Sequence, residues 1–493
     1  MNKWTGILLS VGLAVSGFAQ TTLIWDGGEG GTGTDLNTAA NWSGDAVPAS
    51  TGAAAEGRHD ATWNGSVAGP LSLSFGSAFG GAYGVGLVMK AGQTNSLTLL
   101  NSVATAQTLR IVSSTGATNG GIQIARGAGA FTIGAADSAN PIQLVLGTGA
   151  GAQKYYFVNN SAKTAIIGEN VTITKGGNHN ASLIFSAGNW DVKGVIGALS
   201  VKANSGALSV TAGTVTLSGN NTGHGEVLVN GGTLKISAAN NLGVGTKAVR
   251  LGQQKTSGTL EFTGANNTTI SRPIRIGNGA SAGESGSGTI NNNGAGVLTF
   301  ANATFNEVGN TAAGVNRTLT LGGTNTGDNT ISGVIANNKP GLVSVIKKGS
   351  GKWILSGTNT YTGDTLVSQG TLIMNGCIGF VIGTNGVNNK VSGTGVFNAL
   401  GSFTFDLTGA SQTDGDSWTI VDAAALTETF GDSFTVVGFT DAGDGLWTKD
   451  IDGARYYQFS EADGVLKVMK SSKSVVVGSV EGNEILKIVE SAT

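Results

Sequence analysis

Short runs in which apolar and polar residues alternate recur along most of the chain. They include residues 71–75, 108–112, 171–174, 233–236, 259–262 and 297–300. An alternation of period two places successive side chains on opposite faces of a β-strand. Asn-Gly pairs, such as Asn230-Gly231 and Asn293-Gly294, separate many of these runs, and such pairs adopt tight turns readily. The chain lacks a sustained period of 3.6 with capping residues, so the pattern predicts an all-β protein with few helices.

The best-formed unit of this pattern is residues 348–376, which read KGSGKWILSGTNTYTGDTLVSQGTLIMNG. Two alternating strands flank a polar turn, and such a unit buries its apolar side chains only against a neighbour stacked on it. A worn copy at residues 218–234 aligns without a gap at an offset of 138, with Gly223 at the position of Tyr361. We therefore predict a right-handed parallel β-solenoid, or β-helix.

The unit also resembles the autotransporter-associated β-strand repeat, whose pattern runs G-x-G-x-L-x-L-S-G-x-N-T-Y-T-G-x-T-x-V-x-x-G-T-L. The resemblance implies a secreted bacterial β-helical protein of the passenger type, and it implies no particular chemistry. The positions that we single out as structural repeat positions are Trp353, Gly357, Asn359, Tyr361, Gly363, Gly370 and Leu372, and in the worn copy Gly219, Asn221, Gly225, Gly232 and Leu234.

The ends of the chain differ from its middle. Lys3, an apolar run over 7–15 and the small residues Gly17 and Ala19 predict a signal peptide over residues 1–19. The solenoid is expected over 76–400, with repeats best seen at 214–237 and 348–376. Charged and aromatic residues increase after about residue 400, which predicts a small β region over 401–469, followed by a linker and terminal hairpin or tail over 470–493.

Three tryptophans, Trp25, Trp42 and Trp63, lie in the segment 20–75. We interpret this segment as an N-terminal cap, because bulky aromatic side chains can close the open end of a solenoid. The alternative is an aromatic platform that binds sugars, which would require these side chains to be exposed.

The composition excludes several classes of protein. There are 82 Gly but only 5 Pro, and no strict three-residue Gly period occurs, so a collagen is excluded. Charged residues make up 12% and the net charge is -2, which gives nucleic acid no basic surface to bind. After the signal peptide no apolar run is long enough for a membrane-spanning helix, so we expect no integral membrane segment.

The residues that commonly carry chemistry are sparse. His59, His179 and His224 are far apart, and we expect each to be an exposed turn residue. Cys377 is the single cysteine; it follows the last strand of the repeat, where a small core residue is a better interpretation than a catalytic thiol.

The acidic residues do not form a recognisable site either. Glu226 and Asp364 occupy equivalent positions in the two repeats, so we interpret them as a surface feature of the turn. Asp441, Asp444 and Asp450 belong to an acidic cluster whose spacing does not fit a Ca²⁺ loop. We therefore predict no catalytic residue, no metal site and no cofactor.

Together, the resemblance and the composition suggest a secreted, non-enzymatic surface or extracellular-matrix protein with a structural or adhesive role. The expected partners are polysaccharides or cell-surface components, and end-to-end self-association of solenoids is a further expectation. The alternatives are a carbohydrate-binding protein with an exposed aromatic row, or a β-helical polysaccharide lyase or hydrolase with paired carboxylates in a groove.

Overall fold

The structure is a computed structural model of the chain. The predicted signal peptide and His224 lie outside the residues that it describes. The described residues are 21–51, 57–114, 120–135, 140–147, 152–199, 208–223, 225–277, 286–302, 305, 315–337 and 341–471, together with the backbone of two strands at 473–480 and 483–490.

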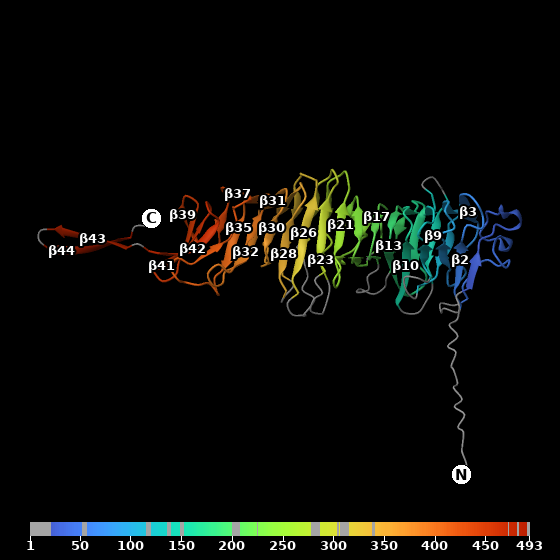
Figure 1. Ribbon diagram of the computed structural model, residues 1–493, viewed down its shortest axis with the longest axis horizontal. Helices are drawn as coiled ribbons and strands as arrows, with labels where there is room; N and C mark the ends of the chain where they lie inside the picture. Colours follow the sequence, from blue (N-terminus) through green and yellow to red (C-terminus); the bar gives the residue numbers. More distant parts are fainter. Residues whose placement is uncertain are drawn as a thin grey trace, which may run out of the picture.

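The molecule is an elongated stack of coils that runs along its long axis from the N-terminal to the C-terminal strands (Figure 1). Each coil crosses up to three sides, and strands of successive coils pair in parallel. The first side is a ten-stranded sheet of β1 (Thr21–Ile24), β2 (His59–Trp63), β4 (Gly86–Met89), β7 (Ile122–Ile124), β10 (Ala152–Asn159), β13 (Asn180–Ala187), β16 (Leu208–Val210), β18 (Val227–Val229), β20 (Val249–Leu251) and β23 (Ile274–Ile276).

The second side is the longest sheet and runs through nearly the whole stack. Its thirteen strands are β3 (Leu71–Phe75), β5 (Leu97–Asn101), β8 (Phe131–Ile133), β11 (Ala165–Ile167), β14 (Asn189–Val192), β17 (Thr214–Leu217), β19 (Thr233–Ile236), β21 (Gly258–Phe262), β24 (Gly288–Asn292), β26 (Arg317–Gly323), β28 (Val343–Lys347), β30 (Thr365–Val367) and β33 (Val391–Gly393).

The third side follows the second in each coil and is divided between two sheets. The earlier sheet has four strands, β6 (Gln107–Ile111), β9 (Ile142–Leu146), β12 (Val171–Lys175) and β15 (Val195–Ile196). The later sheet has seven, β22 (Thr268–Ile270), β25 (Leu298–Phe300), β27 (Asn329–Ile331), β29 (Lys352–Leu355), β31 (Thr371–Met374), β34 (Val396–Ala399) and β37 (Thr427–Phe430). In the last coils a three-stranded sheet follows, made of β32 (Cys377–Val381), β35 (Ser402–Asp406) and β38 (Thr435–Val436).

Antiparallel strands follow the solenoid. A five-stranded sheet has the order β36 (Ser417–Thr419), β42 (Val465–Lys470), β41 (Arg455–Ser460), β40 (Leu446–Asp450) and β39 (Thr440–Gly443). Phe459 of this sheet lies 5.7 Å from Phe403 of β35, measured between ring centroids, so the sheet packs against the last coils. β43 (Lys473–Val480) and β44 (Asn483–Glu490) form an antiparallel hairpin. The predicted limits of the cap, solenoid and C-terminal region stay predictions.

Successive coils pair in phase, so equivalent side chains stack in the interior. Val215 is paired with Leu234, Leu234 with Leu260 and Leu260 with Ile290, and all four are fully buried. This follows from the alternation in the sequence, because a period of two turns every second side chain inward. The predicted all-β parallel solenoid is confirmed. The described residues contain no α-helix, and only short 3-10 turns occur: η1 (Glu29–Gly31), η2 (Ala39–Asn41) and η4 (Ala239–Leu242).

The three N-terminal tryptophans are buried and in contact. Trp25 and Trp42 meet edge to face at 5.0 Å between ring centroids, and Trp42 and Trp63 meet at 5.7 Å. Each of the three is at most 1% exposed, and Trp42 Nε1 donates a hydrogen bond to the oxygen of Leu36. The aromatic platform that a sugar-binding reading of these residues requires is therefore contradicted, because no face of these rings is open to a ligand.

Candidate functional site: the stacked repeats and the pocket beside the worn copy

The asparagine of each repeat joins three successive coils. In the well-preserved copy, Asn359 accepts a hydrogen bond from the backbone N–H of Ile335 in the preceding coil at 3.0 Å. Its amide nitrogen donates to the oxygens of Gly357 and, in the following coil, Cys377, at 3.0 and 3.1 Å. Asn359 is 2% exposed, so these bonds form out of water, where an unsatisfied polar group would be costly.

Asn221 of the worn copy makes the same bridge. It accepts a hydrogen bond from the N–H of Ile196 at 2.7 Å and donates to the oxygen of Asn241 at 2.6 Å. The backbones match as well, because the N–H groups of Thr222 and Gly223 both donate to the oxygen of Ile196. In the other copy, those of Thr360 and Tyr361 both donate to the oxygen of Ile335. The turns of the two copies therefore share the same hydrogen bonds at the offset of 138 residues, although the strands around them lie on the first and second sides in the worn copy and on the second and third sides in the other.

The aromatic residues of the well-preserved repeat fill its interior. Tyr361 is fully buried, and its hydroxyl is 2.7 Å from Oγ1 of Thr365, which gives the phenol a partner inside the core. Trp353 is also fully buried and donates from Nε1 to the oxygen of Gly322 at 3.0 Å. Leu372 and its counterpart Leu234 are fully buried on the third and second sides of the stack.

The glycines of the repeat lie where coils approach most closely. A Cβ atom on Gly357 would collide with the backbone oxygen of Gly333, and one on Gly219 would collide with that of Gly194. Gly370 has a φ of 69°, a left-handed conformation that favours glycine, and a Cβ there would lie 2.5 Å from the oxygen of Gly351. Gly363, Gly232 and Gly225 complete the predicted set; a Cβ on Gly363 or Gly232 would also lie within 2.8 Å of the preceding coil's backbone.

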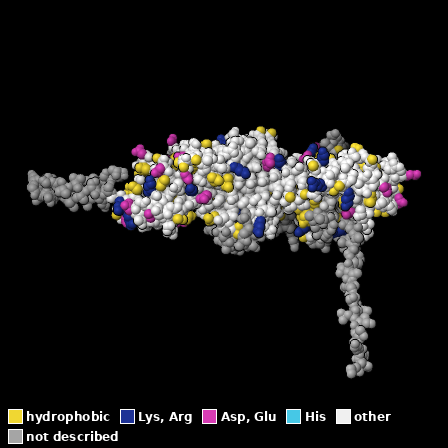
Figure 2. All heavy atoms as spheres, in the orientation of Figure 1, with side chains coloured by type: hydrophobic (Ala, Val, Ile, Leu, Met, Phe, Trp, Pro, Cys, Tyr) yellow, Lys and Arg dark blue, Asp and Glu magenta, His cyan; other side chains and the backbone are white. Residues whose placement is uncertain are grey.

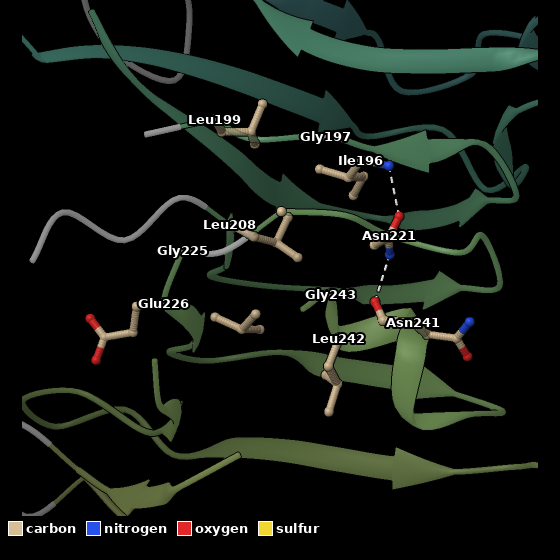
Figure 3. Close-up of a pocket in the computed structure, with 12 residues that line it drawn as sticks. Ile196, Gly197, Leu199, Leu208, Asn221, Gly225, Glu226, Asn241, Leu242 and Gly243 are labelled. Atoms are coloured by element: carbon tan, nitrogen blue, oxygen red, sulfur yellow. Dashed lines mark hydrogen bonds between the residues drawn. The ribbon is translucent and has the colours of Figure 1, made fainter. Parts of the chain in front are cut away.

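A pocket lies beside the worn copy (Figure 3), and Gly223 is one of the residues that line it. Its volume is about 30 Å³. The wall is mostly apolar. It is formed by Ile196, Gly197, Leu199, Leu208, Asn221, Gly223, Gly225, Glu226, Val227, Asn241, Leu242 and Gly243. Figure 3 shows Leu199, Leu208 and Leu242 around the space, with the asparagine bridge on one side.

Glu226 departs from its predicted role as a surface feature. Its side chain is 10% exposed and forms an ion pair with Arg250 at 2.8 Å and a longer one with Arg275 at 3.8 Å. Arg250 and Arg275 are register partners in neighbouring strands of the first side, which brings both guanidinium groups to one carboxylate. Its counterpart Asp364 is exposed and accepts a hydrogen bond from the N–H of Lys390. The prediction is therefore wrong for Glu226, because sequence equivalence does not show which cations the next coils supply.

Two further cations are buried among backbone carbonyls. Lys347 is fully buried, and its Nζ donates to the oxygens of Gly349 at 2.6 Å and of Lys348 and Gln369 at 3.0 Å. Burial lowers the pKa of this ammonium to about 8. Arg272 donates to backbone oxygens, including that of Gly225 at 2.6 Å, and burial lowers its pKa to about 10 although Glu226 opposes the shift. Sequence analysis missed both, since neither residue belongs to the repeat pattern.

The histidines are not exposed turn residues where the structure describes them. His179 is 2% exposed, and its Nε2 lies 3.2 Å from the hydroxyl of Tyr155. Burial is the main cause that lowers the pKa of His179. His59 begins strand β2 and is half-buried, and its Nδ1 accepts a hydrogen bond from Ala49 N–H at 3.4 Å. The prediction is wrong for both, because solenoid coils cover positions that look peripheral in the sequence.

The cysteine and the acidic cluster do not form a reactive site. Cys377 is a free, buried thiol that fills the core beside Thr404, as expected. Asp441 and Asp450 accept hydrogen bonds from backbone N–H groups of their own turns, while Asp452 pairs with Arg455. Among the described residues, no group of three or more His, Cys, Asp or Glu is placed to hold a metal ion.

The surface is mostly uncharged. On the described part of the face in Figure 2, lysine, arginine and acidic side chains are scattered among neutral atoms and do not gather into one large patch. Within the described ranges, no helix is long and apolar enough to cross a membrane.

These features define a class: a parallel β-solenoid whose coils are bridged by the asparagine and glycine positions of a recurring repeat. The family model described as the passenger-associated-transport-repeat matches residues 212–236 and 345–374, which are the two copies described above. The chain therefore carries repeats of the autotransporter-associated family, and the resemblance seen in the sequence is confirmed.

A relative among curated proteins points the same way. Over 140 residues, or 28% of this chain, the sequence is 35% identical to the adhesin BmaC autotransporter of Brucella suis biovar 1 (strain 1330). The chain spans 3% of the length of that relative. Together, the repeat family and this relative support a secreted or cell-surface protein.

Proposed function

We propose that this protein is a secreted, non-enzymatic surface or extracellular-matrix protein with a structural or adhesive role. The observation that carries the proposal is that the residues characteristic of the repeat point inward. Asn221, Asn359, Tyr361 and Trp353 are all buried and hold one coil to the next. The repeat thus builds a rod, and the outward positions of its strands are available for contact with a partner.

The similarity to an adhesin supports adhesion as the more specific role. Because the chain spans 3% of that relative, the whole relative's activity is a proposal here and not a property of this chain. We further propose that the segment 1–19 directs export and is removed. N-terminal sequencing of the secreted protein tests this, with Gln20 expected as the first residue.

The proposal is tested by incubating the purified chain with a panel of insoluble polysaccharides and with immobilised cell surfaces. Bound protein and released sugar ends are measured in the same wells. We expect retention on at least one surface without release of sugars. Cleavage of any polysaccharide would overturn the non-enzymatic role, whereas binding to one polysaccharide without cleavage would identify a carbohydrate partner.

A variant of an exposed side chain and a denatured sample separate specific surface recognition from non-specific adsorption. Leu366 is 37% exposed on the second side, and its register partner Ile346 is half-buried beside it. Leu366→Ser should weaken retention that depends on this outward face and leave the fold intact, because exposed substitutions usually change stability by less than about 0.5 kcal/mol. Retention of a heat-denatured sample at the same level would show that binding does not require the solenoid.

A further inference from the structure

A groove lies where the third side of the solenoid is interrupted. The earlier sheet of this side ends at β15 and the later one begins at β22, and among the described residues between them this side holds a turn at Asn221 and the 3-10 helix η4 in place of strands. The groove has a volume of about 230 Å³. One wall includes Asn240, Gly243 and Gly245, and the other includes Thr269, Ser271 and Arg272, all within the described range 225–277. We call this space the edge groove.

Strand β22 is the edge of its sheet, so part of its backbone faces the edge groove. The N–H of Thr268 donates to the oxygen of Val297, and the oxygen of Ile270 accepts from the N–H of Ala301, so both residues turn their backbone groups toward β25. Successive residues of a parallel ladder turn these groups to opposite neighbours. Thr269 therefore directs its N–H and its oxygen to the other side, where β22 has no strand partner among the described residues. The groove thus offers one backbone donor and one backbone acceptor.

The side chains at the rim of the groove suit a ligand with several hydroxyl groups. Asn240, Thr269 and Ser271 are exposed and uncharged. Asn240 donates one amide hydrogen to Oδ1 of Asn220 at 2.6 Å, which leaves its second amide hydrogen and its oxygen for a ligand. The volume suits a single sugar unit, since sites for drug-sized ligands are larger, at about 300–1,000 Å³.

A buried cation also lines the groove. Arg272 is 6% exposed, and its guanidinium donates only to backbone oxygens. Among the described residues no carboxylate forms an ion pair with it; Glu226 is close enough to affect its pKa but pairs with Arg250 at 2.8 Å. A buried charge that is bonded only to neutral groups favours an anion nearby. The groove therefore favours a ligand that carries a negative charge beside its hydroxyl groups.

We propose that the edge groove binds one uronate unit of an acidic polysaccharide, a sugar that carries a carboxylate in place of its primary alcohol. The carboxylate lies toward Arg272, and the ring hydroxyls pair with Asn240, Ser271 and the backbone of Thr269. The groove is partly open to solvent, so the neighbouring sugar units continue outside it. This inference rests on the adhesive role proposed above, for which it names a class of partner.

The test titrates the full chain with a galacturonate trimer and follows the amide signals of Thr269 and Ser271 by NMR. We expect saturable shifts of both signals. A galactose trimer and the uncharged methyl ester of the galacturonate trimer should bind about tenfold or more weakly, because they lose the charge-assisted interaction. Arg272→Met should bind the galacturonate trimer and its ester equally, and if this variant does not fold, the comparison in the parent protein decides. Equal affinities in the parent protein, or no saturable shift at millimolar galacturonate trimer, would overturn the proposal.

Two other probes ask whether the groove recognises a sugar or only a carboxylate. Acetate carries the carboxylate alone, and a triglutamate peptide with blocked ends carries carboxylates on a polypeptide. Neither should shift the amide signals of Thr269 and Ser271 at concentrations at which the galacturonate trimer saturates them. If either probe binds as tightly as the trimer, the assignment to a sugar is wrong.

A pair of matched variants tests the position of the site. Thr269→Trp places a bulky ring in the groove and should abolish the shift of the Ser271 amide. Thr330 lies in the same outward row two strands away, through its register partner Thr299, and is not part of the groove wall. Thr330→Trp should therefore bind the galacturonate trimer as the parent protein does. Equal binding by the two variants would place the ligand elsewhere and refute the site.

The outcomes for this site and for the adhesive role can be told apart. If cell surfaces retain the chain but the galacturonate trimer does not bind, the uronate site is wrong and the adhesive role stands. If the trimer binds but no surface or polysaccharide of the panel retains the chain, the adhesive role is wrong and the uronate site stands.

Discussion

Replacing Asn359 by alanine should destabilise the solenoid locally by about 2–5 kcal/mol. The N–H of Ile335 would lose its bond to Asn359, and a buried donor without a partner costs about 1–3 kcal/mol. The oxygens of Gly357 and Cys377 each retain one backbone donor, from Cys377 and Asn359 respectively, so the two lost side-chain bonds add only about 0.5–1 kcal/mol each.

Native-state hydrogen exchange at the Ile335 amide measures this effect directly, and urea unfolding followed by circular dichroism measures the global change. Local exchange is the sharper assay, because stacked repeats open in neighbouring units. Asn375→Ala, at an exposed asparagine of the next turn, is the control and should change stability by less than about 0.5 kcal/mol. Unchanged protection of Ile335 in Asn359→Ala would refute the idea that the asparagine bridge holds the coils.

Three other predictions concern the backbone and the buried titratable groups. Gly370→Ala should lower the free energy of unfolding in urea by more than about 2 kcal/mol, because Gly370 has a φ of 69° and a Cβ there collides with the neighbouring coil. The control Gly415→Ala, at a φ of 88° in open space, should lower it by about 1 kcal/mol. Equal losses in the two variants would contradict the steric argument. The pKa of Lys347 is about 8 in the folded chain and has an ordinary value of 10.5. Between these two pH values the unfolded chain binds more protons than the folded chain, so stability should rise with pH. Urea midpoints measured across this pH range should show the rise in the parent protein and not in Lys347→Met. The pKa of His179 is lowered from 6.5 in the folded chain, so the unfolded chain binds more protons and stability should fall as the pH drops below about 6.5. Thermal melts should show this fall in the parent protein and not in His179→Gln. Identical pH profiles for the two proteins would disprove the prediction.

The fold was predictable because the strands of a parallel solenoid show short-range patterns of apolar and polar residues in the sequence. Alternation at 233–236 and 259–262 specifies which side chains turn inward, and Leu234 and Leu260 do stack in register. The equivalence of Asn221 and Asn359 was also visible, since both belong to the same string of turn residues. These features depend on residues that are close together in the sequence, within one coil.

Contacts between coils were harder to predict, because they depend on how many residues each coil contains. Glu226 meets Arg250 only because the intervening coil brings their strands into register, and Asp364 has no such arginine at the corresponding place. His179 lies in a segment rich in Gly and Asn, which is typical of an exposed turn, yet the hydroxyl of Tyr155 and the surrounding coils enclose it. The pocket lined by Gly223 could not be predicted either, because its walls come from several coils.

The direction of the hydrogen bonds between coils determines how the molecule would respond to a pulling force. The hydrogen bonds of a parallel stack run along its long axis, so tension on the two ends pulls successive strands apart in the direction of their pairing. When one pair of neighbouring coils separates, a coil of about 25 residues is released. Its length along the axis then increases from about 4.8 Å, the spacing of paired strands, to roughly 80 Å for the extended chain. A tether of this design would lengthen stepwise under force and dissipate work at each step.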